Sequence, residues 1–213
     1  MTAALLVTAD AGSDFGGDLY RDITEFAADT PSWFQHLAEL GTEGGILILL
    51  ALFLGAWWRA RRGSDRVMTL ALLAPVATGV AYFLSEILKT WVQEERPCRA
   101  VPGASPIAEC PEPGDWSFPS NHSAIAAGAA FTLFLVWRTA FWFALPVAVL
   151  TALSRSFLGV HYFHDVVAGF AWGAAVSPLV LMVLTRPGLM VVSRLRMQPA
   201  LKPLLIANVA RHR

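Results

Sequence analysis

The sequence predicts an all-α protein, a multi-pass membrane helical bundle of about five transmembrane helices preceded by N-terminal interfacial helices. Two observations indicate this fold class. Of the 213 residues, 55% are hydrophobic and 15% are charged, which is far more apolar than an ordinary soluble domain. The apolar residues also gather into long runs whose lengths approach those of membrane-spanning helices.

The N-terminal segment, residues 1–43, is expected to lie on the membrane rather than cross it. Charged residues recur too often between residues 18 and 40 for a spanning helix. The apolar residues there recur at helical spacing, which is typical of helices in a membrane interface. We therefore expect two short interfacial helices, whose apolar faces consist of Leu19, Ile23 and Phe26 before Pro31, and of Trp33, Leu37 and Leu40 after it.

Residues 44–184 contain the predicted transmembrane domain. Each of its apolar runs approaches the roughly 20 residues that cross a bilayer as a helix. The runs cover residues 44–58, 68–88, 123–137, 141–158 and 166–184. The third run begins with small residues, which allow close helix packing in lipid, so this helix is expected at the centre of the bundle. Residues 185–213 form a basic tail.

The distribution of charge predicts the orientation. The formal net charge is zero, so bulk charge gives no sign of a nucleic-acid partner. Basic residues in short loops mark the cytoplasmic side of a membrane protein. One side carries Arg59, Arg61, Arg62, Arg66, Arg138, Arg186, Arg194, Arg196, Lys202, Arg211 and Arg213, whereas the other carries Arg21, Lys89, Arg96, Arg99 and Arg155. The C-terminus is therefore expected in the cytoplasm of the cell, and the loop 96–118 outside.

Both cysteines of the chain, Cys98 and Cys110, lie in this external loop. Two cysteines this close in sequence can form a disulfide in an oxidising compartment. Two free thiols remain the alternative.

The junction of the fourth and fifth runs, residues 154–165, interrupts the apolar sequence with cations, imidazoles and a carboxylate. If Asp165 opens the last helix and His161 lies one turn before it, both side chains share a face. The carboxylate then binds one ring nitrogen and leaves the other bare, as in a nucleophile or general base. Taken alone, the stretch could also be a solvated loop at the membrane surface.

Two further helix ends carry polar residues on the same predicted side. If the second run continues as a helix to Pro97, Lys89 and Arg96 lie on one face about 10 Å apart. Snorkelling of two interfacial cations is the alternative. Ser120, Asn121 and His122 directly precede the third run and are ordinary helix-capping candidates. The same geometry directs free N–H groups outward, where they can bind phosphate.

Three sequence motifs are predicted to lie on the outer surface: Lys89 with Arg96-Pro97, Pro119-Ser120-Asn121-His122, and Ser154-Arg155 with His161 and Asp165. In order and spacing they resemble the three-part signature of the type 2 phosphatidic acid phosphatase (PAP2) family, over about residues 44–184. The resemblance implies a helical, metal-independent phosphatase without a cofactor. One position departs from the family pattern, because Asn121 stands where glycine is usual, which puts the shape of the pocket and the substrate subclass in doubt.

The resemblance also implies the role of each matching residue. His161 would attack phosphorus to form a phosphohistidine, Asp165 would orient His161, and His122 would protonate the leaving oxygen and later activate water. The expected phosphate-binding residues are Lys89, Arg96, Ser120, Asn121, Arg155 and, more weakly, Ser154. A metal site around His161, His164 and Asp165 is the alternative, but it would leave the remote cations without a role.

The expected partners are the lipid bilayer and a lipid phosphate substrate. Among small members of the family, the activity expected first is hydrolysis of a polyprenyl pyrophosphate such as undecaprenyl pyrophosphate. Hydrolysis of phosphatidic acid or phosphatidylglycerol phosphate is the alternative, and a non-catalytic lipid-phosphate binding or transport protein is a second one. The sequence indicates no oligomeric state.

Overall fold

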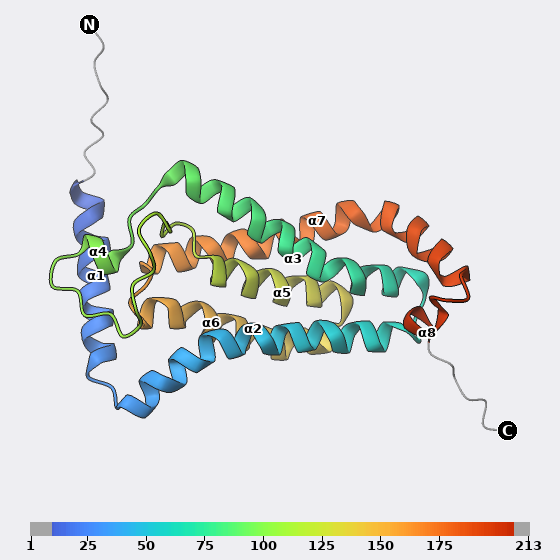
Figure 1. Ribbon diagram of the computed structural model, residues 1–213, viewed down its shortest axis with the longest axis horizontal. Helices are drawn as coiled ribbons and strands as arrows, with labels where there is room; N and C mark the ends of the chain where they lie inside the picture. Colours follow the sequence, from blue (N-terminus) through green and yellow to red (C-terminus); the bar gives the residue numbers. More distant parts are fainter. Residues whose placement is uncertain (1–9, 207–213) are drawn as a thin grey trace, which may run out of the picture.

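The computed structural model describes residues 10–206 and contains only helices and loops over that range (Figure 1). The all-α prediction is therefore confirmed. The helices are α1 (Asp10–Ala28), α2 (Ser32–Ala60), α3 (Asp65–Val92), α4 (Pro97–Ala100), α5 (Asn121–Val136), α6 (Arg138–Phe157), α7 (Phe163–Met197) and α8 (Lys202–Leu205).

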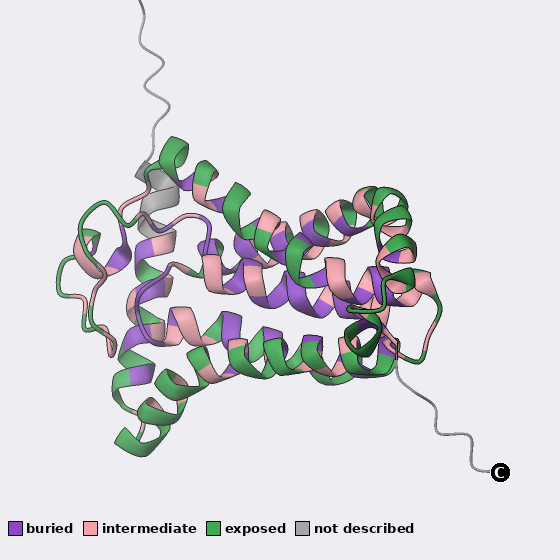
Figure 2. Cartoon of the chain, turned by 45° about the vertical axis from the view of Figure 1, so that its right-hand side comes forward, coloured by how far each residue is buried: buried purple, intermediate pink, exposed green. Residues whose placement is uncertain are grey.

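Five of these helices, α2, α3, α5, α6 and α7, run up and down alongside one another as a bundle (Figure 1). Helix α5 is central and contacts the other four, and buried residues concentrate on it in Figure 2. The predicted close packing of its small residues is present. Gly128 packs so tightly on Ser177 of α7 that a Cβ atom there would overlap the serine hydroxyl.

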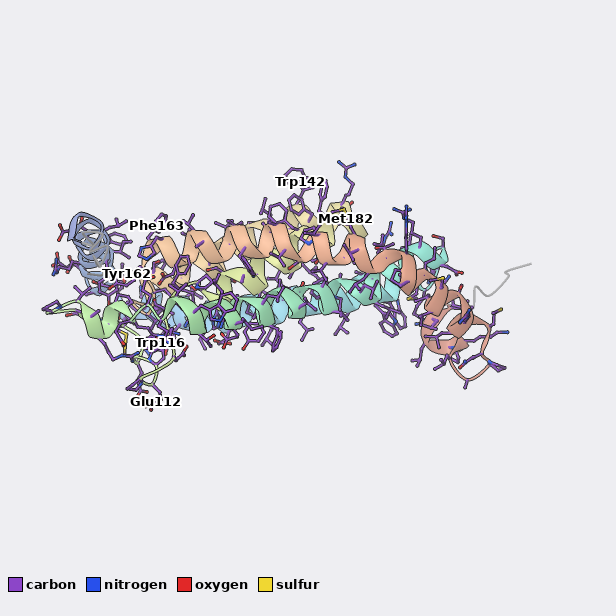
Figure 3. All side chains as sticks on the ribbon, turned by 90° about the horizontal axis from the view of Figure 1, so that it is seen from above. Glu112, Trp116, Trp142, Tyr162, Phe163 and Met182 are labelled. Carbon is purple, nitrogen blue, oxygen red and sulfur yellow. A yellow bond between two sulfur atoms is a disulfide. The ribbon has the colours of Figure 1, made fainter. Side chains whose placement is uncertain are left out.

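Four helices within the described residues, α2, α3, α6 and α7, are long and apolar enough to cross a membrane. The 16-residue helix α5 is shorter but equally apolar in character, and it lies inside the bundle. Large apolar side chains cover the outside of the bundle; Trp142 and Met182, both exposed, point away from it in Figure 3. An apolar surface of this extent suits lipid contact.

The N-terminal segment differs from the expectation of two short interfacial helices. Helix α1 is separate and lies across the end of the bundle (Figure 1). The second helix begins after Pro31 and continues without a break into the first spanning run, so the boundary expected at residues 43 and 44 falls inside α2. No proline interrupts α2 after Pro31, so the helix continues through the expected boundary. Glu43, at that boundary, lies 3.0 Å from His122.

The opposite end of the bundle carries the basic residues between 59 and 202 that the sequence assigned to the cytoplasm. Helix α7 extends beyond residue 184 to Met197, so part of the expected tail is helical. Arg196 pairs with Asp65 at 2.8 Å and donates to the Gly63 carbonyl. Arg61 donates to the Pro203 carbonyl within α8. The remainder of the tail, residues 207–213, lies outside the described residues.

Candidate active site

The polar end of the bundle is formed by the C-terminal ends of α3 and α6, the N-terminal ends of α5 and α7, and helix α1 (Figure 1). The structure brings eight of the predicted site residues to this end: Lys89, Arg96, Ser120, Asn121, His122, Arg155, His161 and Asp165. The ninth, Ser154, lies on the side of α6 instead.

Asp165 is the anchor of the site and lies in the first turn of α7, fully buried. Its Oδ2 atom accepts hydrogen bonds from the Tyr162 backbone N–H at 2.9 Å and from the Ser117 hydroxyl. The same oxygen lies 3.3 Å from Nδ1 of His161. A carboxylate at this position satisfies free N–H groups of the helix start and interacts favourably with the helix dipole. Three groups therefore hold one oxygen of Asp165.

His161 is 2% exposed, and each of its ring nitrogens has a partner. Nε2 lies 3.1 Å from Nη1 of Arg96. A guanidinium can only donate, so Nε2 carries a lone pair and the ring proton lies on Nδ1, facing Asp165. Burial, aided by the charges of Arg96 and Arg155, lowers the pKa of His161 from 6.5 to about 3 in spite of the opposing effect of Asp165. The imidazole is therefore neutral and chemically able to act as a nucleophile at pH 7.

The loop that carries His161 is held in place by helix α1. The buried Tyr20 hydroxyl donates to the Gly159 carbonyl at 2.9 Å, and the Tyr20 ring packs edge-on against Tyr162. Gly159 has a φ of 79°, and a Cβ atom there would lie 2.8 Å from Cα of Pro106. Only glycine fits both the left-handed conformation and the narrow space.

Lys89 and Arg96 approach each other by a different route from the one expected. Helix α3 ends at Val92, where Gln93 adopts a φ of 52°, and Pro97 begins the short helix α4 instead of ending α3. The two cations are not on one helix face. They meet through Asp115, whose Oδ1 lies 3.4 Å from Nζ of Lys89 and 3.0 Å from Nη2 of Arg96.

The start of α5 places its three predicted residues in different surroundings. The Ser120 N–H donates to the Asp165 carbonyl at 3.1 Å, and its hydroxyl accepts from Ser123. Asn121 turns its side chain to α3, where it contacts Ser85 and Glu86. His122 places Nε2 3.0 Å from Oε1 of Glu43 on α2. Ser120 is fully buried, whereas Asn121 and His122 are partly exposed.

Arg155 enters the site from the end of α6 and pairs with none of the carboxylates among the described residues within 4.0 Å. Its Nη1 lies 3.4 Å from Oγ1 of Thr42, and its buried Nε has no partner in the described part of the chain. A partly buried guanidinium with free donors is suited to an anion. Ser154 differs, because its hydroxyl donates back to the Thr151 carbonyl at 2.8 Å.

Three residues of the site carried no signal strong enough to select them from the sequence. Asp115 and Ser117 stand next to the Pro119-to-His122 motif, which was the only available hint. Glu43 belongs to no motif. Its position one residue after Thr42 places α2 in contact with both Arg155 and His122.

Cys98 and Cys110 form a disulfide with a Cα–Cα distance of 6.0 Å. The bridge closes the segment between residues 98 and 110, and Asp115 and Ser117 follow shortly after Cys110. Arg99 reinforces the same loop by contacting Glu95 and the Pro111 carbonyl.

A metal-ligand set exists near the site, although not the one considered from the sequence. Glu94, His164 and Asp165 each place one ligand atom within 4.8 Å of the others. His164 Nε2 hydrogen-bonds Glu94 at 2.8 Å and lies 3.2 Å from Oδ1 of Asp165, which has no hydrogen-bond partner among the described residues. His161 is not in this set, because its two nitrogens face Asp165 Oδ2 and Arg96.

The sequence model of the PAP2 superfamily matches residues 70–188, which include every predicted site residue. The chain belongs to the PAP2 superfamily. The match extends from α3 through most of α7, so the PAP2 signature predicted from three motifs corresponds to the polar end of the bundle. Membership is also supported by relatives that are named as phosphatases, and the protein is accordingly a lipid phosphatase of this superfamily.

Three curated relatives are similar to the chain over half of its length or more. Bacitracin transport permease protein BcrC of Bacillus licheniformis is 30% identical over 66% of this chain and 73% of its own length. An undecaprenyl-diphosphatase of Sulfolobus acidocaldarius is 31% identical over 55% of this chain and 57% of its length. Phosphatidylglycerophosphatase B of Bacillus subtilis is 28% identical over 68% of this chain and 70% of its own length.

A solved structure shares the fold. The transmembrane PAP2 phosphatidylglycerolphosphate phosphatase of Bacillus subtilis superposes with a TM-score of 0.60, 22% identity, and coverage of 85% of this chain and 87% of that one. The shared fold therefore extends beyond residues 70–188, the part of the chain that matches the family model.

Proposed function

We propose that this protein hydrolyses a polyprenyl diphosphate, undecaprenyl pyrophosphate to undecaprenyl phosphate, through a phosphohistidine on His161. The observation that carries the proposal is the arrangement at His161: a neutral imidazole with its lone pair on Nε2, held by Asp165 and next to Arg96. The undecaprenyl-diphosphatase relative supports the choice of substrate.

The proposed chemistry has two steps. Nε2 of His161 attacks the terminal phosphorus while the bond to the bridging oxygen breaks, and His122 gives that oxygen its proton. His122 then takes a proton from a water molecule, and the water oxygen attacks phosphorus. The bond between phosphorus and Nε2 breaks, which releases inorganic phosphate and restores His161. Lys89, Arg96 and Arg155 balance the charge of the phosphoryl oxygens, which is the main requirement of phosphoryl transfer. Asp165 stabilises the positive charge that the imidazole acquires in the first step.

An apolar groove next to the site supports a lipid substrate. The groove has a volume of about 570 Å³ and lies between the first half of α2 and α6. Its lining includes Phe34, Gly41, Gly44, Ile48, Leu150, Thr151, Ser154 and Phe157. Thr42, which contacts Arg155, lies in the same turn of α2 as the lining glycines. An acyl or prenyl chain in this groove would bring its phosphate to Arg155.

We further propose that the site opens to the extracytoplasmic side and that the C-terminus is cytoplasmic. The basic residues of the chain concentrate at the other end of the bundle, where Arg59, Arg61 and Arg138 stack on tryptophan or phenylalanine rings. A disulfide at the site end agrees with an oxidising compartment.

Phosphatidylglycerol phosphate is the second candidate substrate, because phosphatidylglycerophosphatase B matches 68% of the chain. The polar side of the site would serve either headgroup. The difference between the two substrates lies in the tail, since the groove receives one prenyl chain or two acyl chains.

The test is phosphate release from purified protein with undecaprenyl pyrophosphate, phosphatidylglycerol phosphate and phosphatidic acid. The proposal predicts the highest kcat/KM for undecaprenyl pyrophosphate and no release by His161→Ala. A matched variant, Gly44→Leu, fills the groove, because a Cβ atom at Gly44 meets nothing within 4 Å. It should raise KM for the long-chain lipid by about tenfold, or about 1.4 kcal/mol, without changing KM for a short-chain phosphate. Preference for a glycerolipid would select the second candidate substrate. Unchanged phosphate release by His161→Ala would refute the mechanism proposed for both substrates.

A further inference from the structure

Asp115 occupies the place where the two buried cations would bind a phosphate group. Its Oδ1 atom lies 3.0 Å from Arg96 and 3.4 Å from Lys89, and its backbone carbonyl accepts from Nε of Arg96 at 2.8 Å. The two cations are 3% and 4% exposed, whereas the Asp115 side chain is 49% exposed. The carboxylate therefore stands between the cations and the solvent.

The donors of Arg96 are almost fully used by the protein itself. Nη1 contacts the Val160 carbonyl at 2.9 Å and His161 Nε2 at 3.1 Å, in addition to the two contacts with Asp115. A guanidinium has five N–H donors, so these contacts leave about one donor free. An incoming phosphate can form the paired hydrogen bonds typical of arginine only if a present partner leaves.

Asp115 is the partner best placed to leave. Its side chain is half-exposed. Partial burial raises the pKa of Asp115, but the hydrogen bonds and charges of Arg96 and Lys89 outweigh this effect and lower the pKa below 3.8. The carboxylate is therefore ionised in the contact and also stable in water. The other partners of Arg96 belong to the buried loop that holds the nucleophile.

The neighbouring chain permits such a movement. Ser117 is fixed, because its N–H donates to the Glu94 carbonyl at 2.8 Å and its hydroxyl contacts Asp165. Gly114, with a φ of 91°, precedes Asp115 on the other side. Figure 3 shows Glu112 at the tip of this loop and Trp116 nearer to the helices. The Asp115 side chain can turn to solvent while Ser117 keeps its contacts with the site.

We propose that Asp115 is a gating residue whose carboxylate holds Lys89 and Arg96 in the substrate-free protein and is exchanged for the substrate's phosphate. This inference rests on the proposed function, because it assumes that these cations bind phosphoryl oxygens. The exchange would disfavour weakly charged anions, which cannot displace a carboxylate. It would also favour release of the inorganic phosphate product, since Asp115 returns to the cations.

The test compares Asp115→Asn with Glu112→Gln, which removes the same charge from an exposed position of the same loop. Binding of inorganic phosphate is measured by calorimetry on the purified full chain, and its inhibition constant is measured during lipid turnover. Asp115→Asn should bind phosphate about tenfold more tightly, corresponding to about 1.4 kcal/mol, while Glu112→Gln stays within about twofold of wild type. Equal or weaker binding by Asp115→Asn would show that Asp115 only supports the fold.

A second measurement needs no variant. Labelling of wild-type carboxylates with a carbodiimide and an amine, read by mass spectrometry, should increase at Asp115 when phosphate is added and stay constant at Glu112. Unchanged labelling of Asp115 at saturating phosphate would overturn the exchange. Neither the calorimetry nor the labelling requires turnover, so failure of the proposed function would appear as absent lipid hydrolysis with the shifts in phosphate binding and labelling intact. Failure of the gate would appear as lipid hydrolysis without the shifts in phosphate binding and labelling.

Discussion

Replacement of Ser117 by alanine tests whether the contacts of Asp165 position the nucleophile. Ser117 is fully buried, and its hydroxyl donates to Oδ2 of Asp165, the oxygen that faces Nδ1 of His161. Alanine removes the hydroxyl and leaves the remaining backbone unchanged. Oδ2 would retain the Tyr162 N–H and the imidazole as partners, so the site is weakened but not dismantled.

The expected magnitude follows from the charge and burial of that contact. A hydrogen bond to a charged group contributes about 1.5–3 kcal/mol to stability. In a protein of this length, each kcal/mol shifts Tm by about 2–4 °C, so Ser117→Ala should lower Tm by about 3–12 °C. Looser positioning of the imidazole should lower kcat by about tenfold, or about 1.4 kcal/mol of transition-state stabilisation. KM should remain within about twofold, because Ser117 contacts neither Lys89 nor Arg96.

The assay is thermal unfolding together with steady-state phosphate release in one detergent. Ser156→Ala is the matched control, because the buried Ser156 hydroxyl has no hydrogen-bond partner among the described residues. That variant should stay within about 0.5 kcal/mol of wild type and keep its kcat. If Ser117→Ala and Ser156→Ala have the same Tm and the same kcat, the reasoning about Asp165 is refuted.

Three other predictions concern the scaffold and its response to acid. Gly169→Ala should destabilise the protein by about 1–3 kcal/mol and lower kcat, since the new Cβ would overlap the Ser120 carbonyl; an unchanged Tm would contradict this. Tyr20→Phe should lower Tm by about 2–4 °C through loss of about 1 kcal/mol at the Gly159 carbonyl, and a higher Tm would count against it. Because burial lowers the pKa of His161 from 6.5 to about 3, the unfolded chain takes up the extra proton in that window, so Tm should fall as the pH falls from 6.5. His161→Gln should reduce this slope, and a Tm that rises on acidification would oppose the assignment.

Much of the fold was predictable because lipid imposes long apolar runs on a membrane helix. The helices that follow the first span begin and end within a few residues of the predicted runs, except that α7 continues to Met197. The N-terminal region was less predictable. Glu43, at the expected boundary, lies inside α2 and contacts His122, a partner across the bundle that no local pattern reveals.

The site shows the same division between local and distant contacts. The spacing of His161 and Asp165 predicts their shared face because both lie around one helix start. The contact between Lys89 and Arg96 depends on a third residue from another loop. Nothing in the spacing of acidic residues distinguishes Asp115, which binds both cations, from Glu112, which binds neither.

Detection of the covalent intermediate tests the central claim most directly. Purified protein would be mixed with undecaprenyl pyrophosphate labelled with ³²P at the terminal phosphate, quenched in alkali within the first turnover and digested for mass spectrometry. We predict an alkali-stable, acid-labile phosphoryl group on the peptide that contains His161, and none in His161→Ala. Rapid hydrolysis by the wild-type protein without any phosphoryl group on His161, or with it on another residue, would contradict the account.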